Sequence, residues 1–281
     1  MFHDGYYEND MQHLGSINVM RRYEPGFDRL ARAAVVSQIP KRISGTKQEV
    51  TFHEVVPQNE VLTNKILASL PAPEFKRLLP FFEPVALSSG ADLNGLNGSD
   101  DFVYFPESAV VSHLYLLKSG GETAAALIGN DGVVGLSAVF ESRPPTYCTR
   151  VMIGGDGLRV KTQVIKQEFA RGECLQRLIL NYMSKRLAQL SQRAVCNGRH
   201  KLADRLCTWL LMIDDRTVDG TLPLTHADIA NQLGAQRAVI TGCCHALRTR
   251  AMISYKRGQI SNLDRKELEA AACECYQVLK Q

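Results

Sequence analysis

The chain has 281 residues, 45% of them hydrophobic, and a formal net charge of +4, which is enough for about two domains with cores of their own. No apolar run approaches the ~20 residues needed to span a bilayer, and the polar N-terminus lacks the apolar stretch of a signal peptide. These features exclude a membrane-spanning protein and favour a cytoplasmic one. The eight cysteines include no Cys-x-x-Cys pair, and no histidine lies at zinc-ligand spacing from a cysteine pair. We therefore expect reduced thiols and no metal site.

Residues 1–59 show no sustained helical or strand period, apart from a short stretch of helical spacing at 27–39 that ends at Pro40. This composition predicts a flexible extension. A basic arm that touches DNA through Lys41, Arg42 and Lys47 is the alternative.

Residues 60–163 begin with a short predicted helix at 61–68 and continue as many short apolar runs separated by glycine, proline and asparagine. Phe102–Phe105 and Val110–Leu117 are two of these runs. Short, regularly spaced strands predict an antiparallel sandwich, roll or barrel.

Residues 164–197 return to a helical period, with a wide apolar stripe along the predicted helix. The stripe includes Leu175, Ile179, Tyr182, Met183, Leu187 and Leu190. We expect part of it to pack on the β domain and the rest to pair with the same helix of a second copy. A core helix without a dimer is the alternative. A further predicted helix, 199–213, carries Trp209.

Residues 198–281 contain the punctuation of a helix-turn-helix. Thr225 and Asp228 have capping-box spacing, and Gly234 is suited to the left-handed turn that ends a helix. A second helix is predicted at about 236–250, with Val239, Ile240, Cys243 and Leu247 on its buried side. Residues 254–261 then predict a hairpin that turns at Arg257–Gly258, which would form a wing.

The helix-turn-helix region is strongly basic. Between Thr221 and Ile260 there are five basic residues and one acid, Asp228, and such a local excess supplies non-specific affinity for nucleic acid. The residues predicted to bind DNA are Thr225, Gln236, Arg237, Thr241, His245, Arg248, Lys256 and Arg257. A helical hairpin with a solvated basic face is the alternative.

The order of these elements, together with several motifs, resembles the Crp/Fnr family of bacterial transcription regulators. The motifs are Val103-Tyr104-Phe105-Pro106, Val110-Val111-Ser112, Gly129 to Gly135, Ala227 to Gly234, Leu263-Asp264-Arg265 and Cys273-Glu274-Cys275-Tyr276. The resemblance implies an α+β fold with a cyclic-nucleotide-binding-like β-roll, a dimerisation helix and a C-terminal winged helix-turn-helix. It also implies a homodimer on near-palindromic double-stranded DNA, with RNA polymerase as a partner if the protein is an activator.

The resemblance also indicates where an effector would bind, near Gly132, Gly135, Leu136, Arg143 and Arg150. Leu136 stands where the cyclic-AMP-binding relative has its ribose-binding glutamate, and the phosphate-binding Arg-Ser pair is replaced near Tyr147-Cys148. A cyclic phosphate would lose its strongest contacts, so the effector is not expected to be cyclic AMP. No cysteine precedes Cys148, which excludes the N-terminal iron–sulfur cluster of the oxygen-sensing branch.

The DNA-reading helix departs from that of the cyclic-AMP regulator. Arg237 keeps the first arginine of the family's reading pattern, while Ala238 and Gly242 occupy the other two positions, so a different operator is expected. No Ser/His/Asp set, paired carboxylates, P-loop or dinucleotide fingerprint stands out, and no enzymatic activity or cofactor is expected.

Two other functions fit the same scaffold. Cys243 is expected in the core and Cys244 nearer the surface, where oxidation would disturb DNA binding and make the protein a thiol-based redox regulator. A ligand-binding module that acts on a protein partner is the third hypothesis. The effector, the operator and the direction of regulation stay open, as does a redox or metal role for Cys273 and Cys275.

Overall fold

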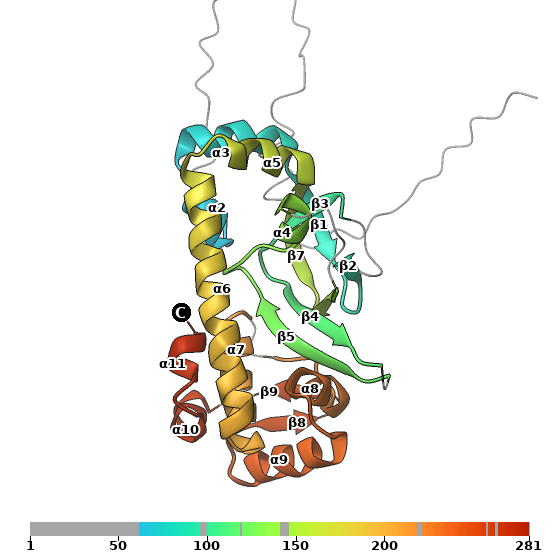
Figure 1. Cartoon of the computed structure of the whole chain (residues 1–281). Helices are drawn as coiled ribbons and strands as arrows, with labels where there is room; N and C mark the ends of the chain where they lie inside the picture. Colours follow the sequence, from blue (N-terminus) through green and yellow to red (C-terminus); the bar gives the residue numbers. More distant parts are fainter. Residues whose placement is uncertain are drawn as a thin grey trace, which may run out of the picture. The chain divides into compact units, whose positions relative to one another are not determined.

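The computed structural model describes residues 62–95, 100–118, 120–140, 146–217, 221–256, 258–261 and 264–280 (Figure 1). These residues belong to one compact unit, Val55–Gln281. The predictions for the extension 1–59 lie outside the described residues. Within the described ranges, no helix combines the length and the apolar character that crossing a membrane requires.

Two antiparallel sheets form a β-roll, one of the three antiparallel architectures that the short apolar runs predict. One sheet has the order β1-β7-β3 and the other the order β2-β6-β4-β5. The strands are β1 (Glu83–Leu87), β2 (Asp92–Gly95), β3 (Phe102–Pro106), β4 (Val110–Leu116), β5 (Glu122–Ile128), β6 (Cys148–Ile153) and β7 (Gly155–Lys161). Val103, Phe105 and Val110 are fully buried, because these strands face the core between the sheets.

Short helices lie beside the roll. In place of the single helix predicted at 61–68, the chain forms a shorter helix at 65–68 and further helical segments after it. α2 (Lys65–Ala68) is followed, after Pro71, by α3 (Ala72–Leu78), the 3-10 turn η2 (Leu79–Phe81) and, later in the chain, α4 (Leu136–Phe140). The buried Asn64 side chain accepts hydrogen bonds from the first turn of α2 and donates to the carbonyls of Pro106 and Gly132. One amide thus joins α2 to the end of β3 and to the loop after β5.

The long helix predicted at 164–197 is two helices, α5 (Thr162–Ala170) and α6 (Cys174–Arg199). The break comes at Gly172, whose φ of +75° favours glycine and ends the first helix. The carboxylate of Glu74 in α3 accepts hydrogen bonds from the amides of Cys174 (3.0 Å) and Leu175 (2.9 Å). A negative charge at this position also interacts favourably with the helix dipole.

The C-terminal part is a winged helix-turn-helix followed by two short helices. Its elements are α7 (Leu202–Asp214), α8 (His226–Leu233), α9 (Arg237–Thr249), β8 (Ser254–Lys256), β9 (Gln259–Ser261), α10 (Arg265–Ala271) and α11 (Tyr276–Leu279). β8 and β9 pair as the predicted hairpin, and Leu222 adds a bridge to Ile260. Trp209 of α7 lies at the centre of the core, with 2% of its surface exposed.

Polar contacts connect α8 to the roll and to the neighbouring helices. The side chains of Ser112 in β4 and Gln232 in α8 are hydrogen-bonded at 3.1–3.2 Å, and both are buried. Arg193 of α6 donates to the carbonyl of Gln232, and Arg205 of α7 to that of Leu233. The end of α8, just before the turn, is therefore fixed by β4, α6 and α7 together.

Candidate nucleic-acid interface

The turn between α8 and α9 has the geometry that its residues predict. Thr225 caps α8 in a reciprocal capping box: its hydroxyl accepts from the amide of Asp228, whose carboxylate accepts from the amide of Thr225 at 2.8 Å. Gly234 ends α8 with φ +61° and ψ +43°, the left-handed conformation of a helix C-terminus. Ile229, Ala230 and Leu233 are buried as expected.

The buried side of α9 differs by a small rotation from the predicted one. Ile240, Cys244 and Leu247 are buried, whereas Val239 is 49% exposed and Cys243 is half-buried. The expectation that Cys243 is the core residue and Cys244 the surface one was therefore wrong. The predicted and the observed sets of buried residues both fit a helical period. Which set is buried depends on the direction from which α7 and α8 pack on α9.

The exposed side of α9 carries the predicted DNA-binding residues. Arg237, Thr241, His245 and Arg248 are all exposed and recur at spacings of four, four and three residues, which places them on one face. Gln236 at the N-cap, Thr225 and Lys256 are exposed as well, while Arg257 lies outside the described residues. α9 contains no acidic residue, so this face presents donors and positive charge to a phosphate backbone.

His226, the first residue of α8, contacts both α9, the predicted recognition helix, and the β8–β9 hairpin, the predicted wing. Its ring stacks on Tyr255 of β8 with centroids 4.4 Å apart, and its Nδ1 lies 3.0 Å from the hydroxyl of Thr241. Burial, with a smaller effect of the nearby Arg237 charge, lowers the pKa of His226 below its usual value. The ring is therefore neutral at pH 7, and it orients Thr241.

Val239 is a candidate contact to DNA, although the sequence pattern predicts that it lies in the core. It lies two residues after Arg237 in the first turn of α9, with half of its surface exposed. In helix-turn-helix proteins the N-terminal residues of the recognition helix meet the base edges, where an apolar side chain packs on a thymine methyl group. Val239 is identified as a candidate because it is an exposed apolar side chain at a helix end that is otherwise rich in polar groups.

Gly242 provides a stability prediction that can be tested without DNA. A Cβ atom built at Gly242 meets nothing within 4 Å, so Gly242→Ala adds no steric conflict to the free protein. The substitution should raise the free energy of unfolding by about 1 kcal/mol, the difference in helix propensity. Urea denaturation followed by circular dichroism measures it, and an unchanged or lowered stability would contradict the open environment described.

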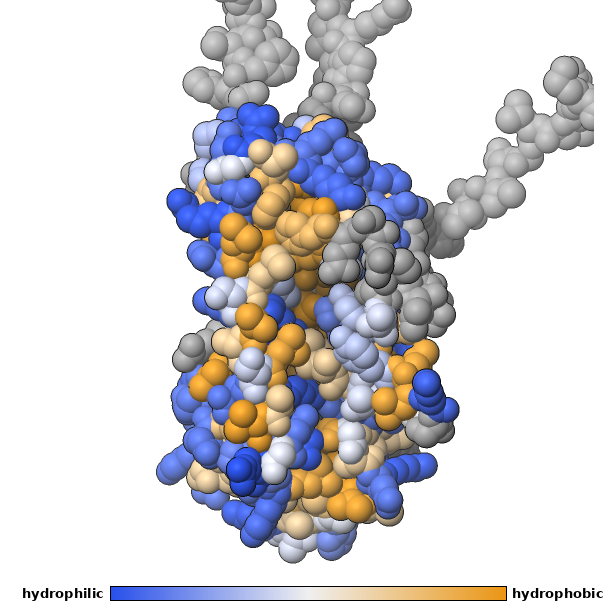
Figure 2. Space-filling model, viewed as in Figure 1, coloured by the Kyte–Doolittle hydropathy of each residue, from blue (hydrophilic) through white to orange (hydrophobic). Residues whose placement is uncertain are grey.

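The predicted dimer-helix residues lie on two different sides of α6. Leu175 and Ile179 are fully buried, and Tyr182 is half-buried with its hydroxyl 3.3 Å from the carbonyl of Val133 in the roll. Met183 and Leu187 remain exposed. The large exposed apolar residues of α6 are Leu180, Met183, Leu187, Leu190 and Val195, and Figure 2 shows hydrophobic residues gathered along this helix.

Two of the predicted effector residues, Gly132 and Arg150, are held by contacts within the protein. Arg150 pairs with Asp92 (2.8 Å) and Glu122 (2.9 Å), so its charge is already neutralised within the sheet. A Cβ atom at Gly132 would lie 2.7 Å from the hydroxyl of Tyr182, so the backbone packs directly on α6. Gly135 has φ +93° and Leu136 begins α4, while Arg143 lies outside the described residues.

Of the two thiols on α9, Cys244 is a core residue and Cys243 is half-buried. Burial raises the pKa of Cys244 to about 11 and also raises that of Cys243. Oxidation proceeds through an accessible thiolate, so neither residue has the environment of a reactive cysteine. This geometry speaks against redox control through these two thiols.

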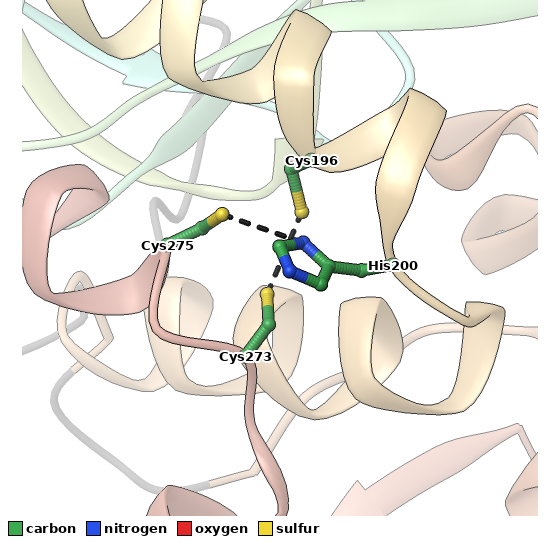
Figure 3. A group of neighbouring side chains, drawn as sticks. All are labelled: Cys196, His200, Cys273 and Cys275. Carbon is green, nitrogen blue, oxygen red and sulfur yellow. Dashed lines mark hydrogen bonds between the residues drawn. The ribbon is translucent and has the colours of Figure 1, made fainter.

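One cysteine group departs from the sequence expectation. Cys196 and His200 at the end of α6 lie beside Cys273 and Cys275, with one ligand atom of each within 4.8 Å of every other (Figure 3). The sequence predicts no metal site because these four residues do not form a motif of short spacing. The two halves of this group are more than seventy residues apart.

A roll, a long helix and a winged helix-turn-helix with a basic exposed recognition face define a class of DNA-binding regulators. Residues 204–271 match the family described as the Crp-like helix-turn-helix domain. Residues 204–271 are thus a Crp-like helix-turn-helix domain, and the roll and long helix before it give the chain the architecture of a DNA-binding transcription regulator.

Solved structures show the same fold at low sequence identity. FixK2 from Bradyrhizobium japonicum is 21% identical with a TM-score of 0.57, over 68% of this chain and 98% of that protein. TTHB099, a CRP-family regulator of Thermus thermophilus, is 14% identical with a TM-score of 0.57, over 67% and 96% of the two chains. The c-di-GMP-responsive regulator CLP of Xanthomonas campestris is 15% identical with a TM-score of 0.55, over 69% and 99%. No curated protein matches the sequence.

Proposed function

We propose that the protein binds a near-palindromic operator as a homodimer, with α9 of each protomer in the major groove. The exposed, acid-free polar face of α9, fixed behind a capped α8 and a left-handed Gly234, is the observation that carries this proposal. Gln236, Arg237, Thr241 and His245 would read bases, with Val239 on a thymine methyl. Thr225, Arg248, Lys256 and Arg257 would contact phosphates.

A second copy of the chain is the partner that the exposed stripe of α6 fits. Leu180, Met183, Leu187 and Leu190 are exposed and alternate at spacings of three and four residues, and Ala194 continues the series. This is the heptad pattern of a two-stranded coiled coil. Pairing of two α6 helices would place the recognition helices roughly one helical turn of DNA apart.

Binding to DNA itself is tested with a labelled random-sequence duplex and fluorescence anisotropy. The logarithm of the affinity should fall linearly with the logarithm of the salt concentration, with a slope of about −0.9 for each phosphate neutralised. A regulator that acts only on a protein partner would show no such binding.

Arg237 is expected to supply the strongest base contact. It lies exposed at the first position of α9, where its fork of donors can bind a guanine edge. Because the dimer makes this contact twice, Arg237→Ala should weaken binding to a selected operator by about 2–6 kcal/mol, about 1–3 kcal/mol per half-site, and relax the preference at one base pair per half-site.

The control for Arg237→Ala removes the same charge elsewhere. Arg177 is an exposed arginine in the first turns of α6, and Arg177→Ala should leave both operator affinity and base preference near those of the wild type. Equal losses in the two variants would show that Arg237 contributes charge alone and reads no base.

We propose that cyclic AMP is not the effector of this protein. Arg150 is paired with two carboxylates, Leu136 offers no acceptor to a ribose hydroxyl, and the Gly132 loop is packed on Tyr182. We propose that the protein acts by binding, not by catalysis, in the cytoplasm where its DNA lies. RNA polymerase is its partner if it activates transcription.

A further inference from the structure

Four potential metal ligands meet where the last turn of α6 contacts the C-terminal segment. Cys196 lies in that turn, and His200, four residues later, directly follows the helix, so both side chains are on the same side. Cys273 and Cys275 come from the segment between α10 and α11. Figure 3 shows all four side chains directed toward one another. The three cysteines are buried, with at most 7% of their surface exposed.

The separations between these atoms match those around one tetrahedral zinc ion. The sulfurs of Cys196 and Cys273 are 3.5 Å apart, and Nδ1 of His200 is 3.5 Å from the sulfur of Cys275. Bond lengths of about 2.3 Å to sulfur and about 2.0 Å to nitrogen place tetrahedral ligands about 3.5–3.8 Å from each other. A small inward movement of the remaining pairs, all within 4.8 Å, would complete the tetrahedron.

The surrounding groups hold the ligands as the outer partners of a metal site do. Nε2 of His200, on the side of the ring away from Cys275, lies 3.2 Å from the carboxylate of Glu274. Metal-bound histidines generally donate their second nitrogen to such an acceptor, which fixes the tautomer. This arrangement leaves Nδ1 as the free acceptor that faces the three sulfurs.

Two of the sulfurs also receive hydrogen bonds that suit thiolates. Nε2 of Gln192 donates to the sulfur of Cys275 at 3.0 Å. The hydroxyl of Thr208 accepts from the amide of Cys273 at 3.2 Å, so its own hydrogen is available to the Cys273 sulfur 3.1 Å away. Plain core thiols would need neither donor.

We propose that Cys196, His200, Cys273 and Cys275 bind one structural Zn²⁺ with three thiolates and one imidazole. The three thiols would lose their protons to solvent as the metal binds, and with four protein ligands the ion would have no open position for catalysis. The site would clamp the C-terminal segment onto the end of α6, beside the buried Thr208 of α7.

A disulfide between Cys196 and Cys273 is the competing interpretation of their contact. It would involve only two of the four residues and would leave the orientation of His200 on Glu274 and the Gln192 contact with Cys275 without a reason. Tetrahedral thiolate and imidazole ligands are the set that selects zinc.

The test uses the full chain purified under reducing conditions without chelators. Elemental analysis should give close to one zinc per chain, and replacement by Co²⁺ should give the visible bands and sulfur-to-metal charge transfer of tetrahedral thiolate coordination. Cys273→Ser should lose the zinc and that spectrum. Cys207→Ser, which changes a buried thiol of the same core outside the group, should keep both.

A milder variant separates metal binding from folding. Glu274→Gln changes an exposed side chain and leaves all four ligands in place, so it should fold normally. Its zinc affinity, measured by competition with a chromophoric chelator, should be about 10–100-fold weaker.

Several results would overturn the proposal. One is wild-type protein that contains no zinc and takes up neither Zn²⁺ nor Co²⁺ with this spectrum. A second is a Cys196–Cys273 disulfide that persists in the reducing buffer, detected as a mass lower by two hydrogens. A Co²⁺ spectrum of octahedral oxygen ligation would also exclude it.

Discussion

Leu187→Asp should convert the protein to a monomer and lower its operator affinity at least 100-fold. Leu187 is 68% exposed in the single protomer, so the substitution leaves the fold of each chain unaffected. In the proposed coiled coil, two aspartates would face each other in an apolar seam. Loss of the dimer removes the second half-site contact, and linking two binding sites contributes about 10²–10⁴ in affinity.

Sedimentation equilibrium and anisotropy measure the two effects of Leu187→Asp, and circular dichroism checks the fold. Ala188→Asp is the matched control because it adds the same charge to the adjacent exposed position of α6, outside the heptad series. It should remain dimeric and bind DNA as the wild type does. A Leu187→Asp protein that stays dimeric would show that this stripe is not the dimer interface.

Asp131→Asn should lower the free energy of unfolding at pH 7 by about 3–5 kcal/mol. Asp131, in the loop after β5, pairs with Arg216, whose side chain is only 3% exposed at the end of α7. The guanidinium also donates to the carbonyl of Met212 at 2.7 Å. Arginine does not lose its proton in proteins, so removal of the carboxylate leaves a buried charge uncompensated.

The effect of Asp131 should also depend on pH in a defined direction. Burial alone would raise the pKa of Asp131, but the Arg216 charge and the amide of Gly129 outweigh it and hold the pKa below its usual value. The stabilisation is therefore complete above the ordinary carboxyl range, about pH 4, and is lost as pH falls through the lower folded-state pKa. The difference between wild type and Asp131→Asn should shrink below about pH 4.

Glu83→Gln is the control for Asp131→Asn because it makes the same carboxylate-to-amide change in an exposed ion pair. Glu83 and Arg159 have half-exposed side chains 2.8 Å apart, and such pairs contribute about 0–1 kcal/mol. Urea denaturation at pH 7 and at pH 3–5 compares the variants. Similar losses for Asp131→Asn and Glu83→Gln would contradict the account of Arg216 as a buried charge.

The features that the sequence predicts correctly are local ones. The Thr225–Asp228 capping box, the left-handed Gly234 and the hairpin at 254–261 each depend on residues within a few positions of one another. Their physical causes act within one turn of the chain. Such elements can be inferred before any packing is known.

The features that the sequence missed depend on which elements pack together. The start of α6 after Gly172 is capped by Glu74, about one hundred residues earlier in the chain, and no local pattern indicates this contact. Cys244 is buried in place of Cys243 because α9 packs in one of two orientations that its period permits. The Cys196–His200 pair meets Cys273 and Cys275 only in the folded chain.

The central claim is that a homodimer recognises two symmetry-related half-sites. Selection of bound sequences from a random DNA pool tests this claim most directly. The account predicts inverted half-sites with centres about 10–10.5 base pairs apart, bound by two protomers, with Arg237→Ala relaxing one position in each half. Enrichment of a single half-site bound by one protomer, or of no sequence at all, would contradict it.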